Sequence, residues 1–173
     1  MKKVGLYIHV PFCVRKCGYC DFYSVTGDEL LMDAYTAAVI DTFREYKGKI
    51  NADTVYFGGG TPSVLGGKRI SAILNAARDM ITDCAEITVE LNPGDSLNEF
   101  FALCSAAGVN RASIGLQSAD DNELRLLTRR HTASDVKEAV RLARLNGINN
   151  ISLDLMLGIE GQTKQSISRS IDL

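Results

Sequence analysis

The hydrophobic and polar residues of this 173-residue chain follow two different rhythms. In five short runs every second residue is apolar, which is typical of strands whose two faces meet different surroundings. In four longer segments apolar residues recur every three or four positions, which predicts amphipathic helices. The predicted strands are 4–10, 53–57, 86–91, 112–117 and 150–156, and the predicted helices are 28–46, 67–81, 96–107 and 134–146. A further helix is predicted from Thr163 onward.

The regular alternation of strands and helices indicates the fold class. Because a helix that connects two strands of one sheet makes a right-handed crossover, the consecutive strands are expected to be parallel. The chain is therefore predicted to be one α/β domain of about five βα units, with a sheet that is open or curled toward a barrel. A hydrophobic content of 46% is enough for a sizeable core.

The two faces of the predicted strands differ in polarity. We expect the apolar face to pack on the helices, and it consists of Leu6, Ile8, Val10, Val55, Phe57, Ile87, Val89, Leu91, Ala112, Ile114, Leu116, Ile151, Leu153 and Leu155. The opposite face consists of Tyr7, His9, Tyr56, Gly58, Thr88, Glu90, Asn92, Ser113, Gly115, Gln117, Ser152, Asp154 and Met156. Branched apolar side chains fill the interior of a closed barrel. The polar face therefore predicts a wider, partly open lumen that holds a polar ligand at the carboxyl ends of the strands.

Charge and composition argue against several classes of function. The net charge of −2 gives no electrostatic basis for binding nucleic acid. No apolar run approaches ~20 residues, so no transmembrane segment is predicted. The apolar stretch 4–12 is short, contains His9 and Pro11 and leads into cysteines, so we interpret it as a strand and not as a secretory signal. Reduced thiols in such a chain point to the cytoplasm.

Three of the five cysteines, Cys13, Cys17 and Cys20, lie within eight residues on a loop after the first strand. Thiolates are soft ligands that suit zinc, copper(I) and iron-sulfur clusters. A disulfide would pair two of these cysteines and leave the third alone. Structural zinc needs a fourth ligand, and the other candidates, Cys84, Cys104 and His131, are isolated in the sequence. A [4Fe-4S] cluster held by three cysteines would leave one iron open for an outside ligand. We interpret Cys84 and Cys104 as small buried hydrophobic residues.

The motif Tyr7-Ile-His9-Val-Pro11-Phe12-Cys13-x3-Cys17-x2-Cys20 resembles the signature of the radical S-adenosylmethionine (radical SAM) enzymes. The similar branch contains oxygen-independent coproporphyrinogen III oxidase and the HemW-type heme chaperones. Segments 58–63, 90–93, 113–118, 129–132, 154–158 and 161–163 also resemble that branch, in the same order. The oxidase carries a fourth cysteine two positions after the third, where this chain has Phe22. In this respect the chain resembles the chaperone subgroup.

The resemblance implies two cofactors and the residues that bind them. Cys13, Cys17 and Cys20 would hold a [4Fe-4S] cluster, and S-adenosylmethionine would be contacted by Tyr7, Tyr19, Gly59, Gly60, Thr61, Glu90, Gln117, Arg129 and Asp154. The residues alone leave alternatives open for three features. Gly58–Gly60 also suits a flexible turn, Glu90 a salt bridge in the lumen, and Arg129 a solvated basic face. No catalytic residue is assigned; His9 is a candidate, with a hydrogen-bonded core histidine as the alternative.

The resemblance also implies a function and partners. Members of this family use an electron, from a donor such as flavodoxin or ferredoxin, to cleave S-adenosylmethionine to a 5'-deoxyadenosyl radical. The chaperones bind heme and deliver it to target proteins, whereas the oxidase decarboxylates coproporphyrinogen III, a porphyrin precursor. Family members are about twice as long. We therefore expect residues 1–173 to form a radical SAM core domain, a partial TIM-type barrel that stops before the sixth βα unit and the C-terminal domain.

Overall fold

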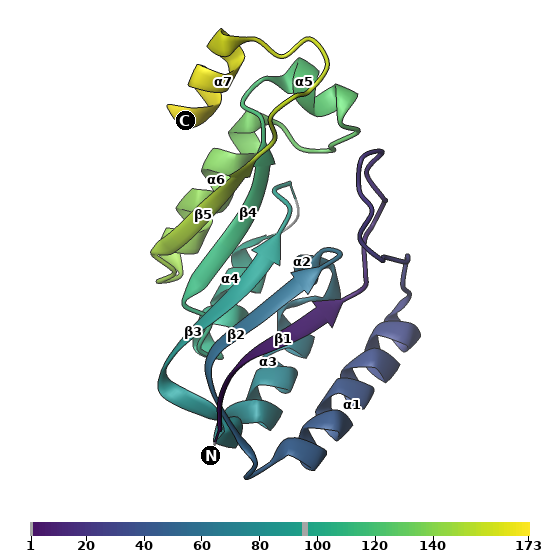
Figure 1. Ribbon diagram of the computed structural model, residues 1–173, viewed down its shortest axis with the longest axis vertical. Coiled ribbons are helices and arrows are strands. Elements are labelled where there is room, and N and C mark those ends of the chain that lie inside the picture. Colours follow the sequence, from purple (N-terminus) through teal and green to yellow (C-terminus); the bar gives the residue numbers. More distant parts are fainter. Residues whose placement is uncertain (1, 95–96) are drawn as a thin grey trace.

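The computed structural model describes residues 2–94 and 97–173. Its centre is a five-stranded parallel sheet in the order β1-β2-β3-β4-β5, so neighbours in the sheet are also neighbours in sequence (Figure 1). The strands are β1 (Lys2–Val10), β2 (Ile50–Gly59), β3 (Ile81–Leu91), β4 (Arg111–Gln117) and β5 (Asn150–Leu155). The predicted α/β class and the parallel sheet are therefore confirmed.

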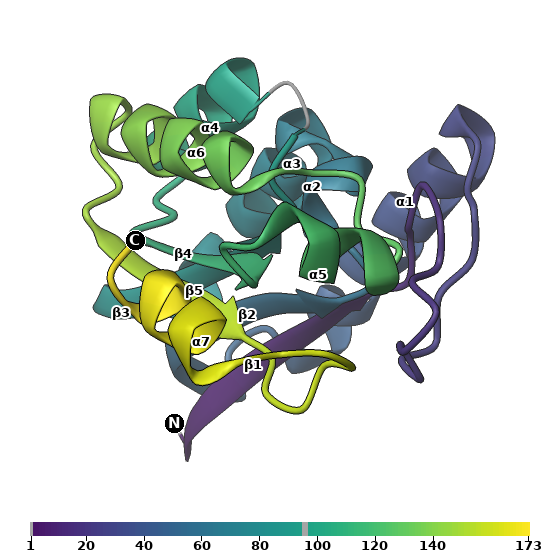
Figure 2. The same ribbon diagram turned by 90° about the horizontal axis from the view of Figure 1, so that it is seen from above.

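The helices divide into two groups by position. Helices α1 (Glu29–Tyr46), α3 (Gly67–Ala77), α4 (Leu97–Ala106) and α6 (Ala133–Leu145) cover one face of the sheet (Figure 2). The short helices α2 (Pro62–Leu65), α5 (Asp121–Leu126) and α7 (Lys164–Ile171) lie toward the carboxyl ends of the strands, as does the loop after β1 (Figure 1). No helix within residues 2–94 and 97–173 is long and apolar enough to cross a membrane.

The predicted apolar face of the sheet forms the core. Phe57, Val89, Ala112 and Ile151 lie side by side in the strand register, and the first three are fully buried. Burial of such side chains supplies most of the stabilisation of a domain, at about 25 cal/mol for each Å² of apolar surface. The prediction fails at Leu155, which is 38% exposed, since β5 is an edge strand in this sheet.

One predicted helix ends earlier in the structure, and two short helices, α2 and α5, were not predicted. The helix predicted at 67–81 ends at Ala77, because residues Arg78–Met80 form a 3₁₀ turn (η1) and Ile81 already pairs with Ala52 of β2. Helix α5 was not predicted, although the side chain of Asp120 caps its first turn by accepting from the Asn122 amide at 2.9 Å. The helix predicted from residue 96 is observed as α4, and Ser96 itself lies outside the described residues.

The two cysteines outside the loop have different environments. Cys104 is fully buried, as predicted, and burial raises the pKa of its thiol to about 12. Cys84 is exposed, so its predicted burial was wrong. The pairing of β2 with β3 jumps from Ala52–Ile81 to Thr54–Glu86, and Cys84 lies in the irregular stretch between these pairs.

His131 is a buried, neutral histidine. It is only 5% exposed, and its Nε2 lies 3.2 Å from the Leu116 carbonyl oxygen, to which it donates. Burial, and to a smaller extent the nearby charge of Arg129, lower the pKa of this imidazole to about 4. An imidazole with a lowered pKa destabilises the folded state when it must take up a proton.

The free energy of unfolding should therefore fall as the pH falls from about 6.5, where an unfolded histidine begins to protonate, toward about 4. Carboxylates titrate in part of the same pH range and also change the free energy of unfolding. The unaltered protein is therefore compared with His131→Gln, which keeps a hydrogen-bond donor but cannot take up a proton. Urea unfolding at a series of pH values should give a flatter profile for this variant between pH ~6.5 and ~4. Parallel profiles would contradict the assignment.

Candidate functional site

The three clustered cysteines lie on a loop that is closed at its base. The Val25 amide donates to the Pro11 carbonyl at 2.7 Å, and the Cys13 amide donates to the Val25 carbonyl at 3.0 Å. Phe12 is 1% exposed and packs edge-on against Tyr35 of α1, with ring centroids 5.3 Å apart. The loop therefore leaves and returns at a fixed point at the end of β1.

All three thiols line one cavity of about 270 Å³. It lies at the carboxyl ends of the strands, where parallel α/β sheets bind their ligands. Its lining includes Cys13, Cys17, Tyr19, Cys20, Phe22, Gly59, Gly60, Thr61, Glu90, Asn92, Ser113, Gly115, Gln117, Arg129 and Asp154. The predicted polar lumen is present, and the structure brings together eleven of the twelve predicted cluster and cofactor residues, Tyr7 being the exception.

The cysteine loop is tied to distant parts of the chain. The sulfur of Cys13 lies 3.4 Å from the hydroxyl oxygen of Thr61, and Arg129 Nη1 donates to the sulfur of Cys17 at 3.7 Å. The Gly18 amide donates to the Thr128 hydroxyl at 2.9 Å. These contacts hold the thiols toward the cavity.

The glycine triplet at the end of β2 permits a close approach of two backbones. The Gly60 amide donates to the Val10 carbonyl at 2.8 Å, and a Cβ at Gly60 would lie 2.7 Å from the Phe12 carbonyl oxygen. Gly59 has φ 109°, and a Cβ there would lie 2.5 Å from the His9 ring. Side chains are sterically excluded at both positions, so the triplet is more than a flexible turn.

Glu90 of β3 points into the lumen, as the strand alternation predicted. The Tyr56 hydroxyl donates to its Oε1 at 2.7 Å, and the Gly59 amide donates to its Oε2 at 3.3 Å. Burial raises the pKa of Tyr56 to about 12, with further contributions from the hydrogen bond to Glu90 and from its charge. Tyr56 therefore stays a proton donor and fixes the orientation of the carboxylate.

Arg129 enters the lumen from the segment after α5. Its Nη2 donates to the Gly115 carbonyl at 2.7 Å, whereas its Nε is buried without a hydrogen-bond partner. Gly115 makes room for this arrangement, because a Cβ there would lie 2.4 Å from Arg129 Nη2 and 2.9 Å from Gln117 Nε2. A buried donor without a partner is costly, which points to an acceptor that a bound ligand supplies. Arg129 is thus not part of a solvated basic face.

The remaining predicted residues lie around this centre. Asp154 of β5 accepts from the Ser113 hydroxyl at 3.4 Å. Tyr19 is 38% exposed, and the pKa of its hydroxyl is raised, chiefly by burial. Tyr7 stacks on Tyr56 with centroids 6.1 Å apart, and His9 lies over Gly59 with its Nε2 3.1 Å from the Tyr23 carbonyl oxygen. Tyr7 and His9 lie beside the cavity, and their roles stay predictions.

Among the residues of the site that were not predicted as site residues, three hold other parts of the site in place. Tyr56 orients Glu90, Asn92 donates to the Thr61 hydroxyl at 2.9 Å, and Thr128 holds the cysteine loop. The strand alternation had already placed Tyr56 and Asn92 on the polar face, so that signal was present. Thr128 follows α5, which was not predicted, and no sequence pattern pointed to this threonine.

The arrangement of thiols fits a cluster with several irons. Within residues 2–94 and 97–173, no three His, Cys, Asp or Glu side chains converge closely enough to hold one metal ion. A cubane cluster does not need such convergence, because each thiolate binds a different iron. The partnerless Arg129 Nε and the Glu90 carboxylate offer a donor and an acceptor to a polar ligand next to the thiols.

Comparison with known proteins identifies the family. The chain is 38% identical over 176 aligned residues to the heme chaperone HemW of Mycobacterium tuberculosis, covering 97% of this chain and 45% of that protein. It is 39% identical over 166 residues to HemW of Escherichia coli, covering 92% of this chain and 44% of that protein. The structure of coproporphyrinogen III oxidase (HemN) from Escherichia coli, a radical SAM enzyme, superposes with a TM-score of 0.87 at 25% identity. This superposition covers 99% of this chain and 41% of that one.

The chain thus spans less than half the length of these relatives. The family model of the radical SAM superfamily matches residues 7–173, from the middle of β1 to the last residue. The resemblance seen in the cysteine motif therefore extends through all five strands, and this chain belongs to the radical SAM superfamily, whose members use a [4Fe-4S] cluster and S-adenosylmethionine.

Proposed function

We propose that this chain forms the cofactor-binding core of a heme chaperone, which binds heme and S-adenosylmethionine and delivers heme to target proteins. The observation that carries the proposal is the single cavity in which three thiols meet a polar strand face. The similarity of the chain to HemW proteins, at 38% and 39% identity, supports the chaperone class.

Each group in the cavity has a distinct task in this proposal. Cys13, Cys17 and Cys20 would hold the cluster, and a set of three thiolates leaves the fourth iron open for an outside ligand. Arg129 offers its charge and its partnerless Nε to the carboxylate of S-adenosylmethionine. Glu90, oriented by Tyr56, accepts hydrogen bonds from ribose hydroxyls.

The other residues complete the pocket for S-adenosylmethionine. The backbone of Gly59 and Gly60 leaves room for close approach, Thr61 and Asp154 offer polar partners, and Tyr19 packs on the bound molecule. Gln117 provides a side-chain amide in the lumen. Tyr7 contributes its aromatic side chain from the edge strand β1. When bound, the two cofactors supply a reductive cleavage that yields a 5'-deoxyadenosyl radical.

The proposal includes partners and a compartment. An electron donor such as flavodoxin or ferredoxin reduces the cluster, and heme-accepting proteins receive the heme. Nucleic acid is not a proposed partner, because the net charge is −2. The cytoplasm is the proposed compartment, and thiols that must stay reduced support it.

The alternative function is that of oxygen-independent coproporphyrinogen III oxidase. The specific observation in its favour is the structural similarity to HemN, with a TM-score of 0.87. Phe22 argues against it, since that side chain lines the cavity and is 66% exposed at the position of the oxidase's fourth cysteine. Optical titration with heme, set beside turnover of coproporphyrinogen III, tests the two functions.

The cluster assignment predicts the effect of removing single cysteines. Anaerobic reconstitution should give about four irons per chain, and Cys17→Ala should abolish the brown absorbance, because that thiol lines the cavity. Cys84→Ala is the matched control, since Cys84 is exposed and not among the lining residues. Iron analysis and absorbance provide the readout. A full cluster in Cys17→Ala, or stoichiometric zinc after oxygen-free purification, would refute the assignment.

The cofactor assignment predicts a loss of affinity at Glu90. Glu90→Ala should weaken S-adenosylmethionine binding by roughly 1 to 3 kcal/mol, the usual effect of removing a charged hydrogen-bond partner. The cluster should stay in place. Glu86→Ala is the control, because Glu86 lies in the middle of β3, away from the strand end that carries Glu90, and is not among the cavity residues. Calorimetry on reconstituted protein measures both, and equal affinity in all three proteins would show that Glu90 does not contact the ligand.

The chaperone proposal predicts little porphyrinogen oxidation. Under anaerobic conditions with reductant and S-adenosylmethionine, the chain should release 5'-deoxyadenosine slowly while coproporphyrinogen III is not consumed. The reason is that Phe22 stands where the oxidase carries its fourth cysteine, so the cavity lacks a thiol that distinguishes the oxidase. Decarboxylation over many turnovers would instead establish the oxidase alternative.

A further inference from the structure

Gln117, at the end of β4, has an unusual backbone conformation. Its φ is 64°, and together with Thr128 it is one of two non-glycine residues with positive φ within the described part of the chain. The Ser118 amide donates to the Leu116 carbonyl at 2.8 Å, which closes a γ-turn around Gln117. Turns of this kind are rare and strained, so the surrounding structure must hold them in place.

The strained turn matters because of where it directs the side chain. Gln117 lines the cavity, and its Nε2 lies over Gly115, 2.9 Å from the position that a Cβ would occupy there. Strained backbone at a ligand cavity is a feature of sites whose geometry is set before the ligand binds. What holds Gln117 therefore also sets the shape of the cavity.

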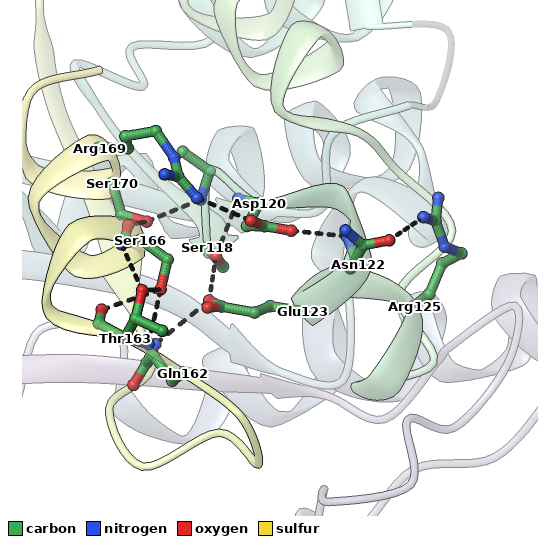
Figure 3. Close-up of polar contacts among 11 residues, drawn as sticks. Ser118, Asp120, Asn122, Glu123, Arg125, Gln162, Thr163, Ser166, Arg169 and Ser170 are labelled. Carbon is green, nitrogen blue, oxygen red and sulfur yellow. Dashed lines mark hydrogen bonds and ion pairs between the residues drawn. The ribbon is translucent and has the colours of Figure 1, made fainter.

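A circuit of hydrogen bonds holds this turn, and Figure 3 shows its part from Gln162 through Glu123 to Ser118. The Met156 amide donates to the Gln117 carbonyl at 2.9 Å, and Gln162 Nε2 donates to the Met156 carbonyl at 3.0 Å. The same Gln162 nitrogen lies 3.3 Å from Oε2 of Glu123, to which it also donates. The Ser118 hydroxyl donates to that oxygen at 2.6 Å, which closes the circuit beside Gln117.

Two members of this circuit are buried, and contacts from outside the circuit support it. Ser118 is fully buried and Glu123 is 5% exposed. Burial by itself raises the pKa of Glu123, but hydrogen bonds from Ser118, Ser166 and Gln162 outweigh it and lower the pKa, so the carboxylate is charged. Helix α7 adds a second connection, since Arg169 pairs with Asp120 at 2.8 Å (Figure 3).

We propose that Gln162 and Glu123 form a lock that holds Gln117 in its strained turn, and that this lock sets the affinity of the cavity for S-adenosylmethionine. The proposal rests on the proposed function, because it takes S-adenosylmethionine as the ligand. It assigns the Gly161-Gln162-Thr163 segment a positioning role, since Gln162 does not itself line the cavity.

The test exchanges the donor amide of Gln162 for an acceptor of the same shape. Gln162→Glu puts a second carboxylate next to Glu123, so it breaks the lock without leaving a hole. Gln165→Glu is the matched control, because it makes the same change at an exposed position of α7. Adding Glu123→Gln to Gln162→Glu removes the repulsion and should restore part of what is lost.

The first readout needs no cofactor. In the protein without a cluster, hydrogen exchange of the Ser118 amide, which reports the γ-turn, should be at least about tenfold faster in Gln162→Glu than in Gln165→Glu. Gln162→Ala, which introduces no repulsion, should show a smaller effect in the same direction and serves if Gln162→Glu does not fold. Unchanged exchange at Ser118 in both variants would overturn the lock, whether or not the chain binds S-adenosylmethionine.

The second readout is the affinity for S-adenosylmethionine in cluster-loaded protein. Gln162→Glu should weaken binding about tenfold at unchanged iron content, but less than about twofold when Gln117 is already alanine, because both changes act through one side chain. Equal losses in the two backgrounds, or faster exchange with unchanged affinity, would overturn the positioning role. If the unaltered chain binds no S-adenosylmethionine, the proposed function fails, while the exchange readout still decides whether the lock exists.

Discussion

The site depends on one close approach between two backbones. Beyond the end of β2, the amides of Gly60 and Thr61 continue to donate to carbonyls of Val10 and Phe12, so the pairing of β1 with β2 runs on into the cysteine loop. A side chain at Gly60 would collide with those carbonyls. This contact fixes the loop next to the strand ends, and the thiols, the glycine backbone and Glu90 then share one cavity because of it.

Around that contact, polar side chains are held by other polar side chains. Tyr56 holds Glu90 and Ser113 contacts Asp154 across neighbouring strands, and Asn92 holds Thr61 just beyond the ends of β3 and β2. Such pairs satisfy polar groups that would otherwise be costly in a half-buried lumen. The Nε of Arg129 is the exception within residues 2–94 and 97–173, and it lies beside the thiols. The polar side chains of this lumen are therefore arranged to bind a ligand.

Much of this arrangement could be predicted from the sequence. Period-two alternation gave the five strands and placed Glu90, Gln117 and Asp154 on one polar face, because a strand admits only two side-chain directions. The register shift that exposes Cys84 could not be predicted, since it depends on how β2 and β3 bulge against each other. Helix α5 and the turn at Gln117 were missed for a related reason: both are held by contacts with residues far along the chain, namely Met156, Gln162 and Arg169.

The ties between the cysteine loop and the segment after α5 have a consequence for the order of synthesis. Cys17 and Arg129 are 112 residues apart, and Gly18 and Thr128 are 110 residues apart. A nascent chain exposes its N-terminal cysteines first, and contacts between distant residues form late in folding. The three thiols thus leave the ribosome long before their partners exist. During translation they depend on the reducing power of the surrounding medium, and not on the fold, for protection against oxidation.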